Sequence, residues 1–235
     1  DLYKEISGDL MNSKRYYSLN EYFAKRFNAK VFKVPINAGF TCPNKTGMAG
    51  YGGCTYCSPS GSGDFAGDKN ADLFTQFNQI KNMMHNKWKN GKYIVYFQAN
   101  TNTYAKVTTL KQKFEPFLNY HPDIVGISIA TRADCLGEEI TEYLASLNKR
   151  TNLFVELGLQ TYHEKTAELI NRGHDYATFV EGVRKLRKHN IEVIAHIING
   201  LPGETQSDML ITVTELFKED IQGIKIHLLH IIKNT

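Results

Sequence analysis

Long apolar runs are missing from this sequence, and their absence limits the class of protein it can encode. No segment reaches the roughly 18 consecutive apolar residues that span a bilayer, and the initial stretch DLYKEISGDL lacks the apolar core of a signal peptide. Internal repeats, low-complexity tracts and linker-like segments are absent as well. We therefore expect a cytoplasmic protein without a membrane partner, built around one large core rather than two.

The sequence also lacks a large excess of charge of either sign. The chain has 28 Lys and Arg residues against 24 Asp and Glu residues, which gives a net charge of +4. This mild basic excess permits an anionic partner but does not require one, because a solvated basic surface is the commoner cause. We expect solvated surface first, and RNA contacts second, for the basic residues of one predicted helix: Arg184, Lys185, Arg187 and Lys188.

Cysteine is scarce, with four residues in 235, but three of the four lie close together. Cys42, Cys54 and Cys57 form the pattern C-x11-C-x2-C, and the glycine-rich stretch between them allows the backbone to fold Cys42 back toward the other two. Clustered cysteines in a reducing cytosol indicate a metal centre rather than a disulfide framework.

Two kinds of metal centre fit three clustered thiolates. A structural zinc ion normally takes four ligands, and Cys135 or a histidine is the candidate for the fourth. A four-iron cluster held by three cysteines instead leaves one iron open to bind another molecule. The spacing alone leaves both alternatives open.

Short β-branched, apolar segments alternate with longer amphipathic ones after about residue 30, which is typical of a parallel α/β fold. We predict strands at 31–36, 93–98, 124–130, 153–160, 192–198 and 224–230. Helices are predicted between them, at 72–88, 137–148, 175–189 and 206–218. An open doubly wound sheet and a partial β/α barrel share this pattern, and in both the active site lies at the carboxyl ends of the strands.

The residues before the first strand form a predicted N-terminal helical arm, 1–30. Ser18 and Glu21 make a capping box there for a helix through Phe27. Residues 31–235 are the predicted core domain. The sequence starts with Asp rather than Met and stops directly after the last predicted strand, without the helix that should cover it. We therefore expect the natural chain to continue beyond residue 235.

Several motifs together resemble those of radical S-adenosylmethionine (SAM) enzymes. The cysteine loop is similar to theirs, with an aromatic residue, Tyr56, directly before the last cysteine, although the usual C-x3-C-x2-C spacing is lengthened here. A narrower resemblance is to the YtqA/YhcC branch, close to the radical SAM domain of the Elongator catalytic subunit. It is carried by FKVPINAGFTCPNKTG, GGCTYC, FQANTNTY, VELGLQT, INRGHDY and INGLPGE.

The resemblance implies a partial (β/α)6 TIM-like barrel over nearly the whole chain from Val31. It also implies two cofactors, a [4Fe-4S] cluster on Cys42, Cys54 and Cys57, and SAM bound at the open iron. One electron from the cluster would split SAM, and the resulting 5′-deoxyadenosyl radical would take a hydrogen atom from the substrate. A flavodoxin- or ferredoxin-type protein is the implied electron donor.

The substrate implied by the Elongator-like branch is transfer RNA, modified at its wobble uridine. Radical chemistry on a small metabolite or a peptide is the alternative within the enzyme class. The alternative outside the enzyme class is a β/α domain that is stabilised by a zinc ion and binds RNA or protein without catalysis.

The same resemblance implies which side chains contact SAM. Gln98, Asn100 and Thr101 occupy the place of a Gly-Gly-Glu stretch that meets the methionyl amine, and a polar turn capped by its own side chains is the alternative explanation. Tyr56 belongs to the cofactor site as the residue before the last cysteine. Arg172 would pair with the methionyl carboxylate, unless its segment serves only as a glycine-capped helix end.

The last three predicted strands carry further candidate ligands. Glu156 in an apolar strand either forms ion pairs inside the barrel or faces SAM, because an unpaired buried carboxylate is costly. The resemblance favours the second explanation and places Glu156 or Gln160 near the sugar or the methionyl group. His196 is expected to be a satisfied core histidine. The resemblance also implies contacts with adenine from Ile197, Ile198 and Leu228.

Overall fold

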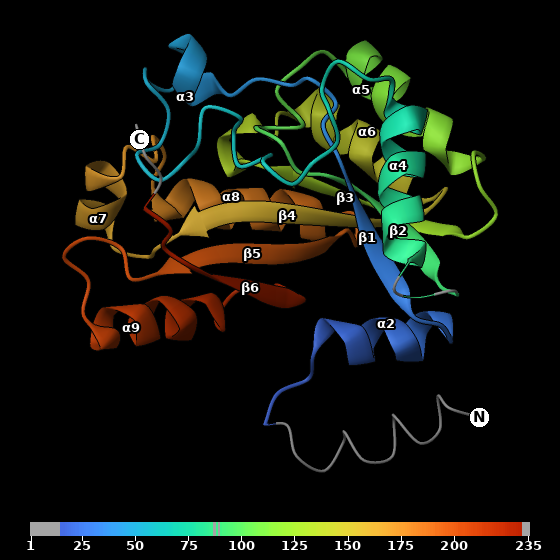
Figure 1. Ribbon diagram of the computed structural model, residues 1–235. Helices are drawn as coiled ribbons and strands as arrows, with labels where there is room; N and C mark the ends of the chain where they lie inside the picture. Colours follow the sequence, from blue (N-terminus) through green and yellow to red (C-terminus); the bar gives the residue numbers. More distant parts are fainter. Residues whose placement is uncertain (1–14, 87, 89, 232–235) are drawn as a thin grey trace.

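Six parallel strands form a single curved sheet in the computed structural model, which describes residues 15–231 except 87 and 89. The strands are β1 (Val31–Ile36), β2 (Lys92–Phe97), β3 (Ile124–Thr131), β4 (Asn152–Gln160), β5 (Glu192–Asn199) and β6 (Gly223–Leu228). Their order across the sheet is their order along the chain, and every neighbouring pair is parallel. A doubly wound sheet would reverse its strand order at a switch point, so the structure confirms the partial barrel (Figure 1).

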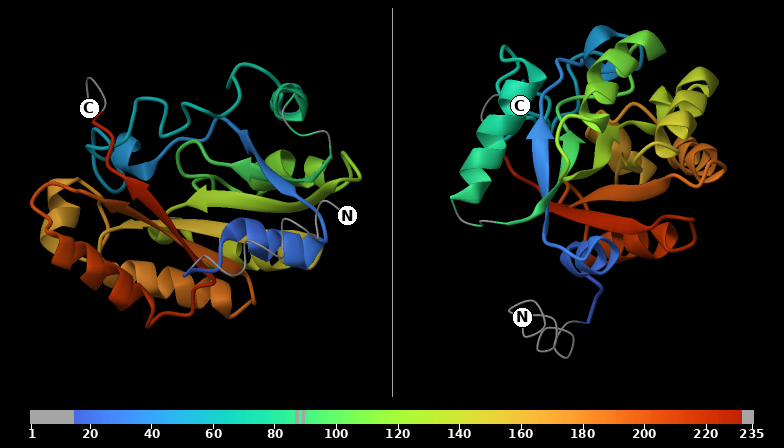
Figure 2. Two further views of the ribbon diagram at one scale, coloured as in Figure 1. Left: turned by 60° about the horizontal axis from the view of Figure 1, so that its bottom comes forward. Right: turned by 90° about the vertical axis from the view of Figure 1, so that its right-hand side faces the viewer.

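Helices precede the first strand and connect the others, and most of the connecting helices cover the outer face of the sheet (Figure 2). They are α2 (Leu19–Phe27), α3 (Pro43–Thr46), α4 (Leu73–His85), α5 (Val107–Phe114), α6 (Glu138–Asn148), α7 (Glu164–Leu169), α8 (Tyr176–Arg187) and α9 (Gln206–Leu216), with 3-10 turns η1 (Glu115–Leu118) and η2 (Ala133–Cys135). No helix in the described part of the chain is both long and apolar enough to cross a membrane.

The predicted elements are present, and their ends differ in ways that the structure explains. Helices α4, α8 and α9 each end slightly before the predicted residue, where helix ends commonly fray. Strand β6 ends at Leu228 instead of continuing to His230, because its partner β5 ends at Asn199, the residue that pairs with Leu228.

Side chains alternate between the two faces of each strand, and this alternation gives the sheet an apolar outer face and a polar inner one. Val34, Val95 and Val155 point outward and are fully buried in the main core beneath the helices. Tyr96 and Glu156, which follow Val95 and Val155, face the inside of the barrel instead. The polar side chains of the strands therefore lie mainly on the inner face of the sheet.

Helix α2 closes the amino-terminal end of the barrel. It begins at the predicted Ser18–Glu21 capping box, and the predicted arm before residue 15 lies outside the described residues. Tyr22 donates a hydrogen bond of 2.6 Å to Glu192, at the start of β5. Figure 1 shows α2 beside the start of β1 and far from α3. Phe23 packs among side chains from three strands, namely Val31, Ile94 and Phe154.

Replacing Phe23 by alanine should destabilise the protein by roughly 3–5 kcal/mol, because it removes a buried aromatic ring and leaves a cavity. Phe23 is 3% exposed, whereas Phe65 is 88% exposed, so Phe65→Ala is a chemically matched control. The control should change the free energy of unfolding by no more than about 0.5 kcal/mol. Urea unfolding followed by circular dichroism measures both variants. Equal midpoints would show that α2 adds nothing to the core.

Candidate active site at the carboxyl ends of the strands

The carboxyl ends of the strands and the loop after β1 enclose a cavity of about 630 Å³. All three clustered cysteines, Cys42, Cys54 and Cys57, line this cavity. Most other residues predicted for the site line it too: Tyr56, Gln98, Asn100, Thr101, Glu156, Gln160, Ile198 and Leu228. The fold thus brings the cysteine loop and the strand ends together in one place.

The cysteine loop takes its shape from a short helix and a left-handed glycine. Cys42 is the N-cap of α3, and Pro43 suits the first helical position because it has no N–H group to leave unpaired. Gly47 ends the helix at φ +91°, where a side chain would be strained. The N–H of Gly53 then donates to the carbonyl of Asn44 at 2.9 Å, which returns the chain to the cavity wall.

The turn between α7 and α8 holds the cysteine loop in place. Asn171 in this turn donates its side-chain amide to the carbonyl of Gly53 at 2.7 Å. Thr55 N–H donates to the carbonyl of Ile170 at 3.1 Å, and the side-chain amide of Asn44 donates to the carbonyl of Asn171. The residues on both sides of the second cysteine are therefore held by hydrogen bonds to this turn, and we call residues 170–171 the clamp.

Polar groups of the protein lie against two of the cysteine sulfurs. Asn44 Nδ2 donates to Cys54 Sγ at 3.4 Å, and Ser62 Oγ lies 3.3 Å from Cys57 Sγ. Burial raises the pKa of the Cys57 thiol, and the Ser62 hydroxyl opposes that effect. Hydrogen-bond donors of this kind stabilise thiolate sulfur, and a coordinated metal deprotonates the thiol. The donor set therefore fits thiolate ligands of a metal centre.

The arrangement of the thiols bears on which centre they fit. Among the described residues, no group of three or more His, Cys, Asp or Glu side chains is arranged to hold a single metal ion. Cys135, the candidate fourth zinc ligand, is not among the residues that line the cavity. Burial, and then the Asp134 carboxylate, raises the pKa of its thiol to about 12. An iron–sulfur cluster binds each thiolate at a different iron, and the three cysteines that would hold it line the same cavity.

The polar turn after β2 ties the cysteine loop to the sheet. Asn100 adopts a φ of +58°, and its side-chain amide donates to the carbonyl of Phe40 at 2.9 Å. Lys45 donates to the side-chain oxygen of Asn100 at 3.1 Å. The main-chain N–H of Thr101 donates to the carbonyl of Thr41 at 3.1 Å. These bonds hold the turn against the cysteine loop, and Asn100 and Thr101 also line the cavity, so their contact with SAM stays a prediction.

Glu156 lies in the barrel interior with a fully buried side chain. Lys33 and Ser128 contact its Oε1, His196 Nε2 donates to Oε2 at 2.6 Å, and Lys225 Nζ lies 3.7 Å from Oε2. Burial alone would raise the pKa of Glu156, but Lys33, His196 and Lys225 hold it well below its usual range. Glu156 thus forms ion pairs inside the barrel, the first of the two explanations, and its contact with SAM stays a prediction.

Comparison with known proteins identifies the family. The model of the radical SAM superfamily matches residues 41–216. This match begins one residue before Cys42 and ends at the last residue of α9. The chain belongs to the radical SAM superfamily.

Relatives of this radical SAM chain extend beyond it in length. It is 59% identical over 222 residues to the uncharacterised protein YtqA of Bacillus subtilis, covering 94% of this chain and 69% of YtqA. It is 36% identical over 212 residues to YhcC of Escherichia coli K12, covering 90% of this chain and 67% of YhcC. The chain therefore spans about two thirds of the length of these relatives.

Two more distant similarities concern the fold and a short stretch of sequence. The archaeal Elp3 of Methanocaldococcus infernus superposes with a TM-score of 0.64 at 17% identity, covering 87% of this chain and 47% of that one. This likeness shows the radical SAM fold. A stretch of 95 residues is 32% identical to a tRNA uridine(34) acetyltransferase of Methanocaldococcus jannaschii, covering 40% of this chain and 16% of that protein.

Two residues predicted to contact SAM, Arg172 and Ile197, are not among those that line the cavity, and their contact with SAM stays a prediction. Arg172 is 1% exposed and donates to the carbonyls of Leu159 at 2.8 Å and Thr161 at 2.6 Å. Its guanidinium thus supports the main chain at the end of β4. Ile197 is buried in the outer core, because adjacent strand residues face opposite sides and Ile198 faces the cavity.

Several charged or titratable residues that line the cavity are missing from the predicted site, among them Arg132, Lys225 and His227. Arg132 forms a two-point ion pair with Asp134 at 2.7 and 2.9 Å, a contact that the sequence gives no means to predict. Lys225 and His227 alternate with isoleucines along β6. This period of two could have identified both residues from the sequence. It marks a polar inner face on the last strand.

Replacing Asn171 by glycine should loosen the cysteine loop without unfolding the protein. Glycine tolerates the left-handed φ of +52° at this position, so the variant removes the amide hydrogen bonds without adding strain. Each lost bond costs roughly 1 kcal/mol. We expect faster protease cleavage within residues 44–62 of the metal-free protein. Asn190→Gly is the matched control, since Asn190 is also left-handed, at φ +55°. Equal cleavage rates in the two variants would contradict the role of the clamp in holding the cysteine loop.

Proposed function

We propose that this chain is a radical SAM enzyme that binds a [4Fe-4S] cluster through Cys42, Cys54 and Cys57 and cleaves SAM reductively. The observation that carries the proposal is that all three cysteines share one cavity with the inner face of the barrel. When bound, the cluster supplies the electron that cleaves SAM. A flavodoxin- or ferredoxin-type protein is the proposed source of that electron.

The chain's own residues would hold SAM and keep water away from it. Ile198 and Leu228 present apolar side chains to the cavity from the ends of β5 and β6 and suit an adenine ring. Gln160 ends β4 at φ +64° and offers an amide to the sugar or methionyl group. Burial, and then the nearby Cys54, raises the pKa of Tyr56 well above its usual range, so its phenol stays neutral and can donate to sulfur.

Anaerobic reconstitution should load about four irons per chain, the content of a [4Fe-4S] cluster. Alanine at Cys42, Cys54 or Cys57 should abolish the visible absorbance of the cluster, because each thiolate holds a separate iron. Cys135→Ala is the matched control and should retain it. With a reductant, the loaded wild type should convert SAM to 5′-deoxyadenosine and methionine, measured by chromatography. One equivalent of zinc with no uptake of iron would contradict the proposal.

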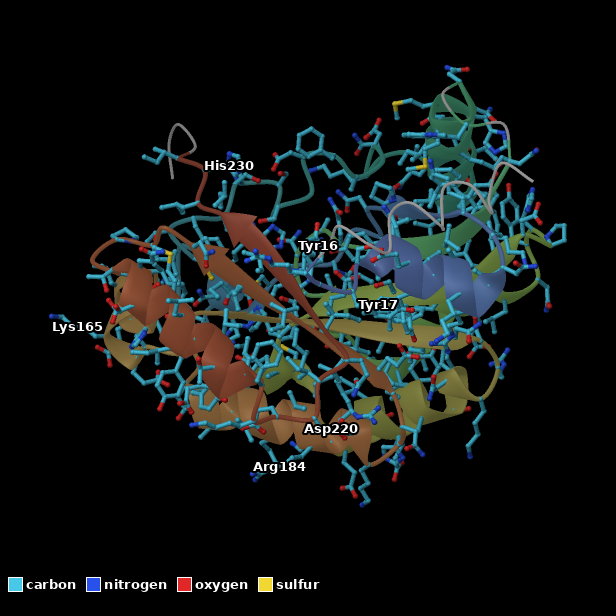
Figure 3. The ribbon with its side chains drawn as sticks, turned by 90° about the horizontal axis from the view of Figure 1, so that it is seen from below. Tyr16, Tyr17, Lys165, Arg184, Asp220 and His230 are labelled. Carbon is cyan, nitrogen blue, oxygen red and sulfur yellow. The ribbon has the colours of Figure 1, made fainter. Side chains whose placement is uncertain are left out.

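We propose transfer RNA, at its wobble uridine, as the substrate. The support is the similarity of one stretch to a protein named as a tRNA uridine(34) acetyltransferase, together with a net charge of +4. The basic helix α8 is not the expected contact surface. Figure 3 shows its Arg184 far from His230, which lines the cavity. An RNA strand would instead meet the cavity mouth, and a uridine would have to swing out of its stack to enter.

Deleting the gene should change the modified nucleosides at the wobble position, measured by mass spectrometry of purified transfer RNA. The full-length gene should restore the profile, and the same gene carrying Cys54→Ala should not. Binding of transfer RNA should weaken as salt rises, because phosphate contacts release counterions. An unchanged wobble-uridine profile would remove transfer RNA as the substrate and favour a small metabolite or a peptide.

A further inference from the structure

The inner face of the barrel carries a layer of six polar residues, four of which line the cavity. Each of the six strands contributes one residue to this layer, and the side chains are linked to one another through Glu156 and Tyr96. The members are Lys33, Tyr96, Ser128, Glu156, His196 and Lys225.

Positive charge exceeds negative charge in this layer. Glu156 is ionised and is shared by two ammonium groups, those of Lys33 and Lys225. Burial lowers the pKa of His196, so its ring is neutral and donates Nε2–H to Glu156. Burial, and then the neighbouring His196, lowers the pKa of His227 to about 4, so this ring is neutral at pH 7 as well. The layer therefore holds two cations against one anion.

Lys225 is the lysine that faces the cavity. Its side chain is 40% exposed, against 21% for Lys33, and Lys225 lines the cavity whereas Lys33 does not. Its contacts within the protein are long, at 3.4 Å to the Tyr96 hydroxyl and 3.7 Å to Glu156 Oε2. An ammonium group has three donor hydrogens, so Lys225 has capacity for another acceptor.

The other charged residues that line the cavity already have hydrogen-bond or ion-pair partners in or near the cysteine loop. Arg132 is paired with Asp134, and Lys45 donates to two oxygen atoms of the loop and the adjoining turn. Asp64 accepts hydrogen bonds from nearby serine hydroxyls at 2.6 and 2.8 Å. Within the polar layer, the cation that faces the cavity is the ammonium group of Lys225.

We propose that Lys225 binds an anionic group of the substrate, a carboxylate or a phosphate. This inference rests on the proposed function, because it places substrate beside SAM in the same cavity. Lys225 lies three residues before the end of β6, which is roughly 10 Å below the strand ends at the usual rise per residue. The cysteines lie on the loop at the mouth. Tyr96 and Glu156 position the ammonium group in advance, which lowers the cost of ordering it on binding.

The first test measures anion binding by the full-length protein without relying on the cluster. Inorganic phosphate, compared with chloride at equal ionic strength, should raise the unfolding temperature of the wild type through preferential binding to the folded state. Lys225→Gln should raise the apparent Kd for phosphate at least tenfold, whereas Lys225→Arg should retain binding. Lys185→Gln is the surface control, since Lys185 is exposed on α8. Equal phosphate stabilisation of wild type and Lys225→Gln would overturn the proposal.

The second test asks whether the anion belongs to the substrate or is the carboxylate of SAM. In cluster-loaded protein, Lys225→Gln should leave the Kd for SAM within about twofold of wild type, and phosphate should not compete with SAM. A tenfold loss of SAM affinity, with no matching loss for decarboxylated SAM, would assign Lys225 to the cofactor and overturn the proposal. If no cluster forms, the proposed function fails, while the phosphate measurement still decides the role of Lys225.

Discussion

The ion-paired carboxylate of Glu156 is the interaction on which the inside of this barrel depends. It contacts side chains from β1, β3, β5 and β6, so one residue of β4 joins five of the six strands. Strands β1 and β6 lie at opposite edges of the open sheet, yet Lys33 and Lys225 meet at this one carboxylate. Backbone hydrogen bonds close a full barrel, whereas here a buried charge bridges the open side. Such a charge is stable only because these partners replace water.

The mouth of the cavity is organised by a different principle. There, side-chain amides from Asn44, Asn100 and Asn171 satisfy main-chain carbonyls of neighbouring segments. These hydrogen bonds hold a long glycine-rich loop that has no apolar core of its own. Asn44 joins the two roles, since the same amide group also faces the sulfur of Cys54. The loop geometry and the environment of its sulfur are therefore coupled through one side chain.

The sequence predicts most of this fold, because periods of 2 and 3.6 are local properties of a chain. The choice between a barrel and a doubly wound sheet was not available from periodicity, since strand order depends on pairing between distant segments. Ile197 could have been excluded by alternation alone, because Ile198 cannot share its face. Arg172 could not have been excluded from the sequence, since its partners are carbonyls at the end of β4 that only the folded chain brings near. The ion pairs of Glu156 were foreseen as one of two explanations, but their partners were not.

The cysteines and the cavity-facing charge of Lys225 lie on two parts of the chain that are held in different ways. The cysteines lie on a loop that is held largely by hydrogen bonds from asparagine side chains to main-chain carbonyls. Lys225 and His227 lie on β6, an edge strand whose outward residue Ile226 is 58% exposed. This outward residue contributes little to the described core, unlike fully buried Val155 in the sheet centre. The inward residue Lys225 differs, because its contact with Glu156 belongs to the ion-pair network inside the barrel.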